Sequence, residues 1–141
     1  MKKFLIINGP NLNMLGAREP HVYGSMTLGE IQSYTENKLA GKAKLDWFQS
    51  NLEGEIISKI QSTLSSDYDA LIINPGGYSH TSVAIYDALK IIKIPIIEVH
   101  LSQVYQREDF RHTLLTAKAA TAIMSGLGKQ SYYVAVSSQL D

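Results

Sequence analysis

No cysteine occurs among the 141 residues of the chain. This absence excludes a disulfide, a thiol nucleophile and a thiolate metal site. The sequence also lacks any apolar run near the roughly eighteen residues that a membrane-spanning helix needs, and the apolar segment 4–7 is too short for a signal peptide. We therefore expect a cytoplasmic protein with no membrane partner.

An excess of charge of one sign is lacking as well, because 13 basic residues balance 13 acidic ones. A net charge of zero gives no electrostatic reason to expect nucleic acid as a partner. It also weakens repulsion between copies, which fits self-association. The length and the 45% share of hydrophobic residues predict one globular domain, residues 1–141.

Continuous apolar runs alternate with amphipathic segments along the chain. Such runs are typical of strands buried on both faces of a parallel sheet. Thr27 and Glu30 form a capping box at the start of the first long helix. The apolar spacing of later helices predicts that Leu64, Val83 and Ala84 face inward. The expected strands are 4–7, 44–49, 70–74, 94–100 and 122–124, and the expected helices are 27–41, about 54–64, 81–92 and 126 onward. This order predicts an α/β fold, a five-stranded parallel sheet with helices on both faces.

The segment from Asn8 to Gly24 is too long for an ordinary strand-to-helix connection. A disordered segment is one interpretation. However, apolar residues at positions 12, 14, 15, 22 and 23 offer surface that can fold back onto the body. We therefore favour an active-site lid, residues 9–26 approximately.

Polar residues stand where predicted strands end. Asn8, Asn74 and His100 end the first, third and fourth strands. Right-handed crossovers bring the carboxyl ends of parallel strands to one edge, where ligands bind in such folds. We therefore expect a site at this edge.

Two further patterns lie at the same edge. Gly76 and Gly77 precede a predicted helix, and paired glycines with a helix N-terminus favour an anion; a plain turn capped by Ser79 or Thr81 is the alternative. Glu98 and His100 project to the same face of a strand, so the carboxylate can hold the imidazole in one tautomer. A histidine that only hydrogen-bonds a loop is the alternative there.

Arg107 and Arg111 share a face if their segment is helical, because they are four residues apart. Surface ion pairs with Glu108 or Asp109 are the alternative. Together with Arg18 on the long loop, these arginines indicate a cationic pocket.

Several other kinds of protein are disfavoured. The four histidines have no metal-ligand spacing, no GxSxG elbow is present, and no GxxxxGK[ST] or GxGxxG phosphate loop occurs. The first strand ends in Asn8 and not in the acidic residues of a phosphoacceptor domain. Two alternatives to an enzyme remain. One is a flavodoxin-like module that binds a nucleotide or flavin, and the other is a protein that has an enzyme's fold but no catalytic activity.

Several short motifs occur in a fixed order along nearly the whole chain: INGPNLN at 7–13, REP at 18–20 with YG at 23–24, QSN at 49–51 with EG at 53–54, NPGG at 74–77, HTSVA at 80–84, EVHLS at 98–102, and RE at 107–108 with FRH at 110–112. Taken together, these motifs resemble the type II 3-dehydroquinate dehydratases. Gln103 and Tyr86 differ from the Asn and Arg that are frequent in that family; neither is a chemical position, and Tyr86 is expected to affect only a subunit contact.

This resemblance implies a flavodoxin-like three-layer sandwich and a lyase. The implied reaction is the anti elimination of water from 3-dehydroquinate to 3-dehydroshikimate through an enolate, without metal or cofactor. It serves the shikimate pathway of aromatic amino acid biosynthesis, or quinate catabolism. The resemblance also implies a homo-oligomer, a dodecamer built as a tetramer of trimers.

Residue roles follow from the same resemblance. Tyr23 is the implied base, and because a free tyrosine has a pKa of about 10, it needs a nearby cation such as Arg18 or Arg107. The other implied catalytic residues are His100 as the acid, Arg18 as the lid residue that acts in the transition state, Asn11 holding a water on the enolate oxygen, and Glu98 and Arg107 as orienting residues. The implied substrate-binding residues are Asn74, Gly76, Gly77, Leu101 and Ser102, with Asn74 and the last two at the carboxylate, and His80, Asp87 and Arg111 at the hydroxyls.

Overall fold

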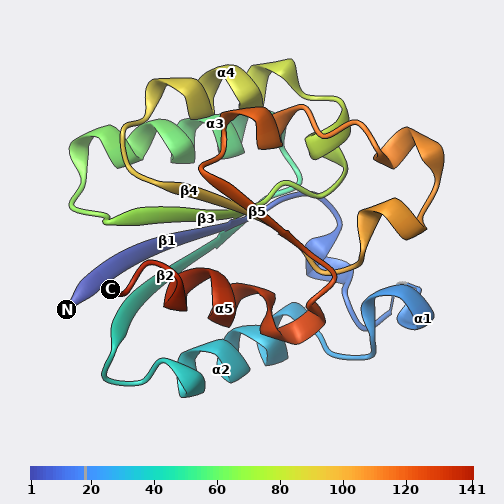
Figure 1. Ribbon diagram of the computed structural model, residues 1–141, viewed down its shortest axis with the longest axis horizontal. Helices are drawn as coiled ribbons and strands as arrows, with labels where there is room; N and C mark the ends of the chain where they lie inside the picture. Colours follow the sequence, from blue (N-terminus) through green and yellow to red (C-terminus); the bar gives the residue numbers. More distant parts are fainter. Residues whose placement is uncertain (18) are drawn as a thin grey trace.

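The computed structural model describes residues 1–17 and 19–141, apart from the side chains of residues 20 and 23. Five parallel strands form one sheet in the order β2-β1-β3-β4-β5 (Figure 1). The strands are β1 Lys2–Asn8, β2 Ala43–Gln49, β3 Ala70–Asn74, β4 Ile96–His100 and β5 Ala122–Ser125. The predicted five-stranded parallel sheet is thereby confirmed, and its order reverses direction between β1 and β3.

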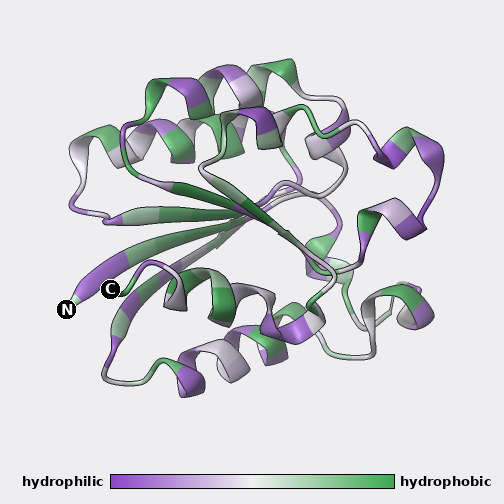
Figure 2. Cartoon of the chain, viewed as in Figure 1, coloured by the Kyte–Doolittle hydropathy of each residue, from purple (hydrophilic) through white to green (hydrophobic). Residues whose placement is uncertain are grey.

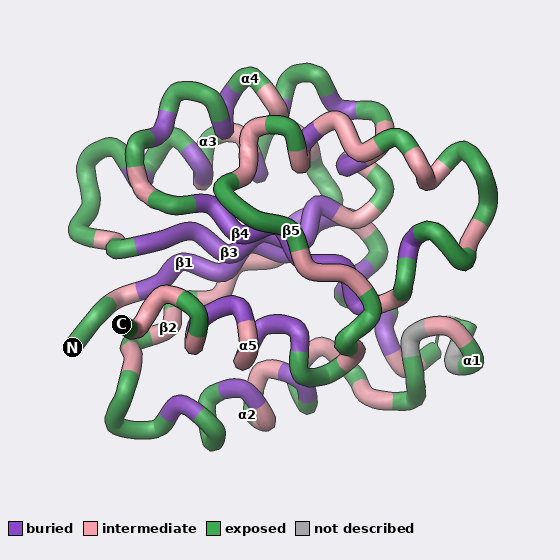
Figure 3. The backbone as a smooth tube through the Cα atoms, viewed as in Figure 1, coloured by how far each residue is buried: buried purple, intermediate pink, exposed green. Residues whose placement is uncertain are grey.

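Helices cover both faces of the sheet, which makes the predicted three layers. In Figure 1, α3 (Glu53–Ser62) and α4 (Val83–Ile91) lie above the sheet, and α2 (Leu28–Lys38) and α5 (Ser131–Ser137) lie below it. Successive strand residues point to opposite faces, so Leu5 and Ile7 pack against α3 and α4, whereas Phe4 and Ile6 pack toward α2 and α5. Figure 2 shows the hydrophobic central strands between helices that carry both hydrophilic and hydrophobic residues, and Figure 3 shows β3, β4 and most of β1 buried, whereas β2 and β5 at the edges are only partly so.

The first long helix begins as predicted. The Thr27 hydroxyl accepts from the Glu30 backbone N–H, and the Glu30 carboxylate accepts from the Thr27 N–H, which completes the capping box. The described part of the chain contains no helix long and apolar enough to cross a membrane.

The predictions for the helices that follow β2 and β3 were wrong in detail. Val83 is 59% exposed and Ala84 is exposed, whereas Ile85 faces the core. The reason is a 3₁₀ helix, η3 (Gly76–His80), which delays the start of α4 until Ser82 caps it by accepting from the Ile85 N–H. Leu64 is 53% exposed because α3 ends at Ser62 and a 3₁₀ turn follows.

Candidate active site

The carboxyl ends of β1, β3 and β4 bring together the three polar residues that the sequence placed there. Asn8, Asn74 and His100 are the last residues of these strands, and all three are buried. The loops beyond them enclose a small cavity of about 30 Å³, here called the inner pocket. Its lining residues are Leu12, Asn74, Gly76, Gly77, His80, His100, Leu101, Ser102, Val104, Arg107 and Arg111.

His100 and Glu98 form the pair that strand alternation predicted. The His100 Nε2 atom lies 2.7 Å from Glu98 Oε2, on the α4 side of the sheet. Glu98 has no exposed surface, and it also accepts hydrogen bonds from Ser79 Oγ at 3.2 Å and from Thr116 Oγ1 at 2.5 Å. A buried carboxylate is costly unless hydrogen bonds satisfy it, and these donors supply them. The hydrogen bond from Thr116 could not be predicted, because in the sequence Thr116 looks like any polar residue of a loop.

His80 is the second imidazole of the inner pocket. Its ring lies 6.3 Å from that of His100, centroid to centroid. The His80 Nδ1 atom lies 2.9 Å from the Thr113 carbonyl oxygen, and because a carbonyl only accepts, Nδ1 carries the proton. Burial lowers the pKa of His80, and nearby His100 and Arg111 act in the same direction, against the opposing effects of the Thr113 hydrogen bond and of Glu98. A neutral His80 therefore offers Nε2 to a ligand as an acceptor.

Arg107 and Arg111 both reach the inner pocket, although the helix assumed between them is absent. Two separate 3₁₀ turns, η4 (Val104–Gln106) and η5 (Asp109–Arg111), occupy the segment. The alternative interpretation also applies, since Glu108 Oε2 lies 2.6 Å from Arg111 Nε and 4.0 Å from Arg107 Nε. The two arginines thus line the pocket and hold Glu108 at once.

Arg107 has further partners on the pocket side. Its Nη1 atom lies 3.4 Å from Ser102 Oγ, and its Nη2 atom lies 3.5 Å from Glu19 Oε2 in the long loop. An arginine keeps its charge at every relevant pH. Arg107 therefore joins the loop after β4 to the segment expected to act as a lid.

Asn74 is held by a buried network on the α5 side of the sheet. Its Oδ1 atom accepts from the Gly76 N–H at 3.2 Å, and its Nδ2 atom donates to the Tyr132 hydroxyl at 3.1 Å. The Tyr132 hydroxyl in turn donates to Asn8 Oδ1. The sequence spacing of Tyr132 indicates only the apolar side of a helix and gives no sign of what its hydroxyl touches.

The loops after β1 and β3 pack backbone against backbone under the pocket. A Cβ atom added at Gly9 would lie 2.4 Å from the Pro75 carbonyl oxygen. A Cβ atom at Gly76 would lie 3.0 Å from the Pro10 carbonyl oxygen, and Gly76 has φ +61°. Glycine is needed at both positions for the loops to approach this closely.

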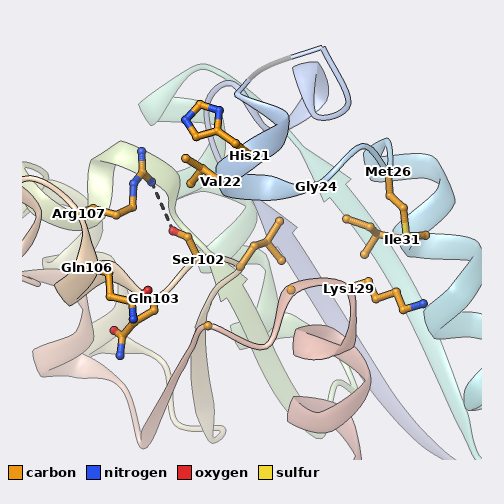
Figure 4. Close-up of a pocket in the computed structure, with 13 residues that line it drawn as sticks. His21, Val22, Gly24, Met26, Ile31, Ser102, Gln103, Gln106, Arg107 and Lys129 are labelled. Carbon is orange, nitrogen blue, oxygen red and sulfur yellow. Dashed lines mark hydrogen bonds between the residues drawn. The ribbon is translucent and has the colours of Figure 1, made fainter.

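A wider cavity of about 540 Å³, here called the outer pocket, adjoins the inner one. Both are lined by Leu101, Ser102 and Arg107. In Figure 4, His21 and Val22 of α1 (Pro20–Tyr23) lie above Arg107 and Ser102, whereas Met26, Ile31 and Lys129 lie across the cavity. The outer pocket is therefore lined by the long loop and by the body of the domain together.

Two other predicted site residues, Asn11 and Asp87, lie outside the lining of the inner pocket. Asn11 is exposed, with φ 69°, and its backbone N–H donates to Asn51 Oδ1 at 3.0 Å. Asp87 is exposed on α4. Arg18 and the side chain of Tyr23 lie outside the described residues. Among the residues that are described, no group of three His, Asp or Glu side chains is arranged to hold a metal ion.

The chain matches the protein family described as dehydroquinase class II over residues 2–140. A 3-dehydroquinate dehydratase of Fusobacterium nucleatum is 47% identical over 137 residues, covering 95% of this chain and 93% of that protein. One from Caldicellulosiruptor bescii is 48% identical over 137 residues, covering 96% and 94%.

Solved structures agree with this match. The type II dehydroquinase from Butyrivibrio crossotus aligns with a TM-score of 0.96 and 39% identity, covering 99% of this chain and 98% of that one. The type II dehydroquinase from Propionibacterium acnes aligns with a TM-score of 0.92 and 33% identity, covering 97% and 94%.

Proposed function

Because the chain belongs to the class II dehydroquinase family, we propose that the inner pocket is where it dehydrates 3-dehydroquinate to 3-dehydroshikimate. The observation that carries this assignment is the buried Glu98–His100 pair, which lies at the sheet edge where the family's other motifs converge. The reaction belongs to the shikimate pathway. A base removes a proton from C2, the resulting enolate expels the C1 hydroxyl, and an acid protonates that leaving group as water.

His100 is the proposed acid. Its Nε2 atom faces Glu98 at 2.7 Å, so Nδ1 is the nitrogen left to give a proton to the departing hydroxyl. The Glu98 carboxylate stabilises the protonated ring before transfer and fixes its orientation, as in other catalytic dyads. Ser79 and Thr116 donate hydrogen bonds to that carboxylate and so fix its position.

Tyr23 is the proposed base, and Arg18 the proposed lid cation. A tyrosinate needs a neighbouring positive charge at neutral pH, and Arg107 is a further cation at the boundary of the two pockets. Asn11 is proposed to hold a water on the enolate oxygen. Preorganised donors at such an oxygen contribute roughly 3–4 kcal/mol each to transition-state stabilisation.

Substrate binding is assigned to the remaining lining residues. Asn74 and the backbone of Leu101 and Ser102 take the carboxylate, next to the backbone of Gly76 and Gly77. His80, through its acceptor Nε2, and Arg111 contact ring hydroxyls. Asp87 is exposed on α4 and does not line its own pocket, so its proposed hydroxyl contact is made to the pocket of a neighbouring protomer.

Residues 9–26 are the proposed lid. The inner pocket, at about 30 Å³, has room for roughly two water molecules, which is too little for a six-membered ring acid. The outer pocket of about 540 Å³ gives the lid space to move. Closure over bound substrate removes water and strengthens each electrostatic contact.

The proposed assembly is a homododecamer of four trimers, in the cytoplasm. Exposed hydrophobic side chains that include Val83, Ile91, Tyr105 and Phe110 support burial of surface between protomers.

A direct assay tests the function. Purified protein mixed with 3-dehydroquinate is expected to raise the ultraviolet absorbance, because the product is a conjugated enone. Tyr23→Phe and His100→Ala are each expected to lower kcat by 10²-fold or more, with small changes in binding, and Tyr34→Phe on α2 serves as the control. Folded wild-type protein without any absorbance change would contradict the function. Near-normal turnover in either variant would contradict that residue's role.

A further inference from the structure

A tyrosine hydroxyl is buried beneath the proposed carboxylate site. Tyr132 has no exposed surface and comes from α5, with its ring packed edge-on against Trp47 at 5.4 Å between centroids. Asn8 and Asn74 are register partners on β1 and β3, so both side chains point to the α5 face of the sheet. The hydroxyl lies between them, donating to Asn8 Oδ1 and accepting from Asn74 Nδ2 at 3.1 Å.

The direction of this network is fixed at one end by the backbone. The Gly76 N–H lies 3.2 Å from the Asn74 side-chain amide and can only donate, so Asn74 must present Oδ1 to it and Nδ2 to Tyr132. The Tyr132 oxygen therefore accepts on that side, and its single proton goes to Asn8 Oδ1. Reversing the Asn74 amide would set two donors against each other at Gly76.

The hydroxyl keeps its proton under all working conditions. Burial raises the pKa of Tyr132 well above its ordinary value of 10.0, and the hydrogen bond from Asn74 offsets only part of this effect. Tyr132 thus stays a neutral connector and takes no part in proton transfer during the reaction.

We propose that Tyr132 is a positioning residue, whose hydroxyl locks the Asn74 amide so that Asn74 presents an N–H donor to the carboxylate of the substrate. An amide nitrogen carries two hydrogens; Tyr132 receives one, and the other is left for the inner pocket, which Asn74 lines. The inference rests on the proposed function, because that function supplies the carboxylate.

A double-mutant cycle tests the coupling. Tyr132→Phe is expected to lower kcat/KM about tenfold, a typical effect of one lost hydrogen bond in a buried network, mainly through KM because the carboxylate is held in ground and transition state alike. In an Asn74→Ala background, the same substitution should change kcat/KM by less than about twofold, because its effect runs through Asn74. Tyr133→Phe, one residue further along α5, is the matched control and should equal wild type.

Each result decides between the claims. Independent, multiplying losses in the cycle, or a folded Tyr132→Phe enzyme with wild-type KM, overturn the positioning role and leave the proposed function intact. If folded wild-type protein shows no turnover, the proposed function itself is wrong.

A second measurement needs no variant and covers the case in which Tyr132→Phe does not fold. Neutron diffraction from deuterium-exchanged wild-type crystals soaked with quinate, which keeps the ring carboxylate, locates the exchanged hydrogens. We expect the Tyr132 deuterium directed at Asn8 and one Nδ2 deuterium of Asn74 directed at the carboxylate. A Tyr132 deuterium directed at Asn74, or an Asn74 oxygen facing the carboxylate, overturns the inference.

Discussion

His80 and His100 face the same small pocket, but their partners differ. Glu98 holds His100 at 2.7 Å, whereas a backbone carbonyl holds His80 at 2.9 Å. A carboxylate stabilises a protonated ring, whereas a neutral carbonyl does much less. This difference fits the roles proposed for them, His100 as the proton donor and His80 as a neutral acceptor for a hydroxyl.

The charge of His80 leads to a prediction about pH. Burial lowers the pKa of His80 from its usual 6.5, so between that lower value and 6.5 the unfolded chain binds more protons than the folded one. The free energy of unfolding should therefore fall as pH drops through 6.5, and the fall should be smaller in His80→Gln. Urea unfolding at several pH values, with NMR titration of His80, measures both effects.

The control for this experiment is His21→Gln, at an exposed position, which shows what the loss of a surface imidazole does. An NMR midpoint for His80 at or above 6.5 would contradict the prediction.

Individual residues also show where the sequence could and could not be interpreted. The Glu98–His100 pair was predictable because strand alternation is a strict rule over two residues. The hydroxyls of Thr116 and Tyr132 were not, since each reaches its partner across a long stretch of chain, 18 residues to Glu98 and 124 to Asn8. Only the folded topology brings such pairs together.

Among the elements, the two loops after β1 and β3 meet beside Asn74: the Gly9 N–H donates to the Asn74 carbonyl oxygen, and the Gly76 N–H donates to Asn74 Oδ1. Gly9 and Gly76 let these loops touch, so the backbone of one loop supports the other. The paired glycines after β3 predicted a close approach to a ligand. No pattern in the sequence indicated that Gly76 also meets a neighbouring loop.

Gly9→Ala should displace this contact. The added Cβ would lie 2.4 Å from a backbone oxygen that no side-chain rotation can move, so we expect the free energy of unfolding to fall by about 1–3 kcal/mol or more and activity to fall with it. Gly54→Ala on α3 is the control: its Cβ meets nothing within 4 Å, and alanine favours a helix by up to about 1 kcal/mol. Thermal unfolding and the enone assay compare the two, and a Gly9→Ala protein as stable as wild type would refute the packing argument.

The start of α4 shows a limit of sequence patterns for whole elements. Apolar spacing from Thr81 onward fits a helix, but it does not show that η3 precedes it or that Ser82 is the cap. A delay of one or two residues rotates the helix by more than a quarter turn. Val83 is consequently exposed on the outer face.

At the scale of the whole molecule, Asp87 provides a test of assembly. If Asp87 serves a neighbouring pocket, each pocket takes His100 from one protomer and Asp87 from another. The variants His100→Ala and Asp87→Ala then remove residues that different protomers supply to the same pocket. Co-expressed, the two variants should form mixed oligomers in which some pockets have both residues intact, with activity well above either variant alone. Size-exclusion chromatography with light scattering checks that all preparations have the same mass, and the wild-type mass tests the dodecamer.

The control is co-expression of two differently tagged His100→Ala chains, which should stay inactive. Mixed oligomers no more active than the separate variants would show that Asp87 does not serve the pocket of a neighbouring protomer.

The hydrogen bond between Tyr132 and Asn8 also bears on when the proposed carboxylate site can be completed during synthesis. It joins residues 124 positions apart. The hydrogen bonds of Tyr132 to Asn8 and Asn74 therefore cannot form until the ribosome has translated nearly the whole chain. Strands β1 to β4 can pair beforehand, but the hydrogen bond from Asn74 to Tyr132 forms only once α5 has left the ribosome and packed against the sheet. If Tyr132 positions Asn74 as proposed, a nascent or C-terminally clipped chain would hold the Glu98–His100 pair but would lack the hydrogen bond that orients Asn74 toward the carboxylate of the substrate.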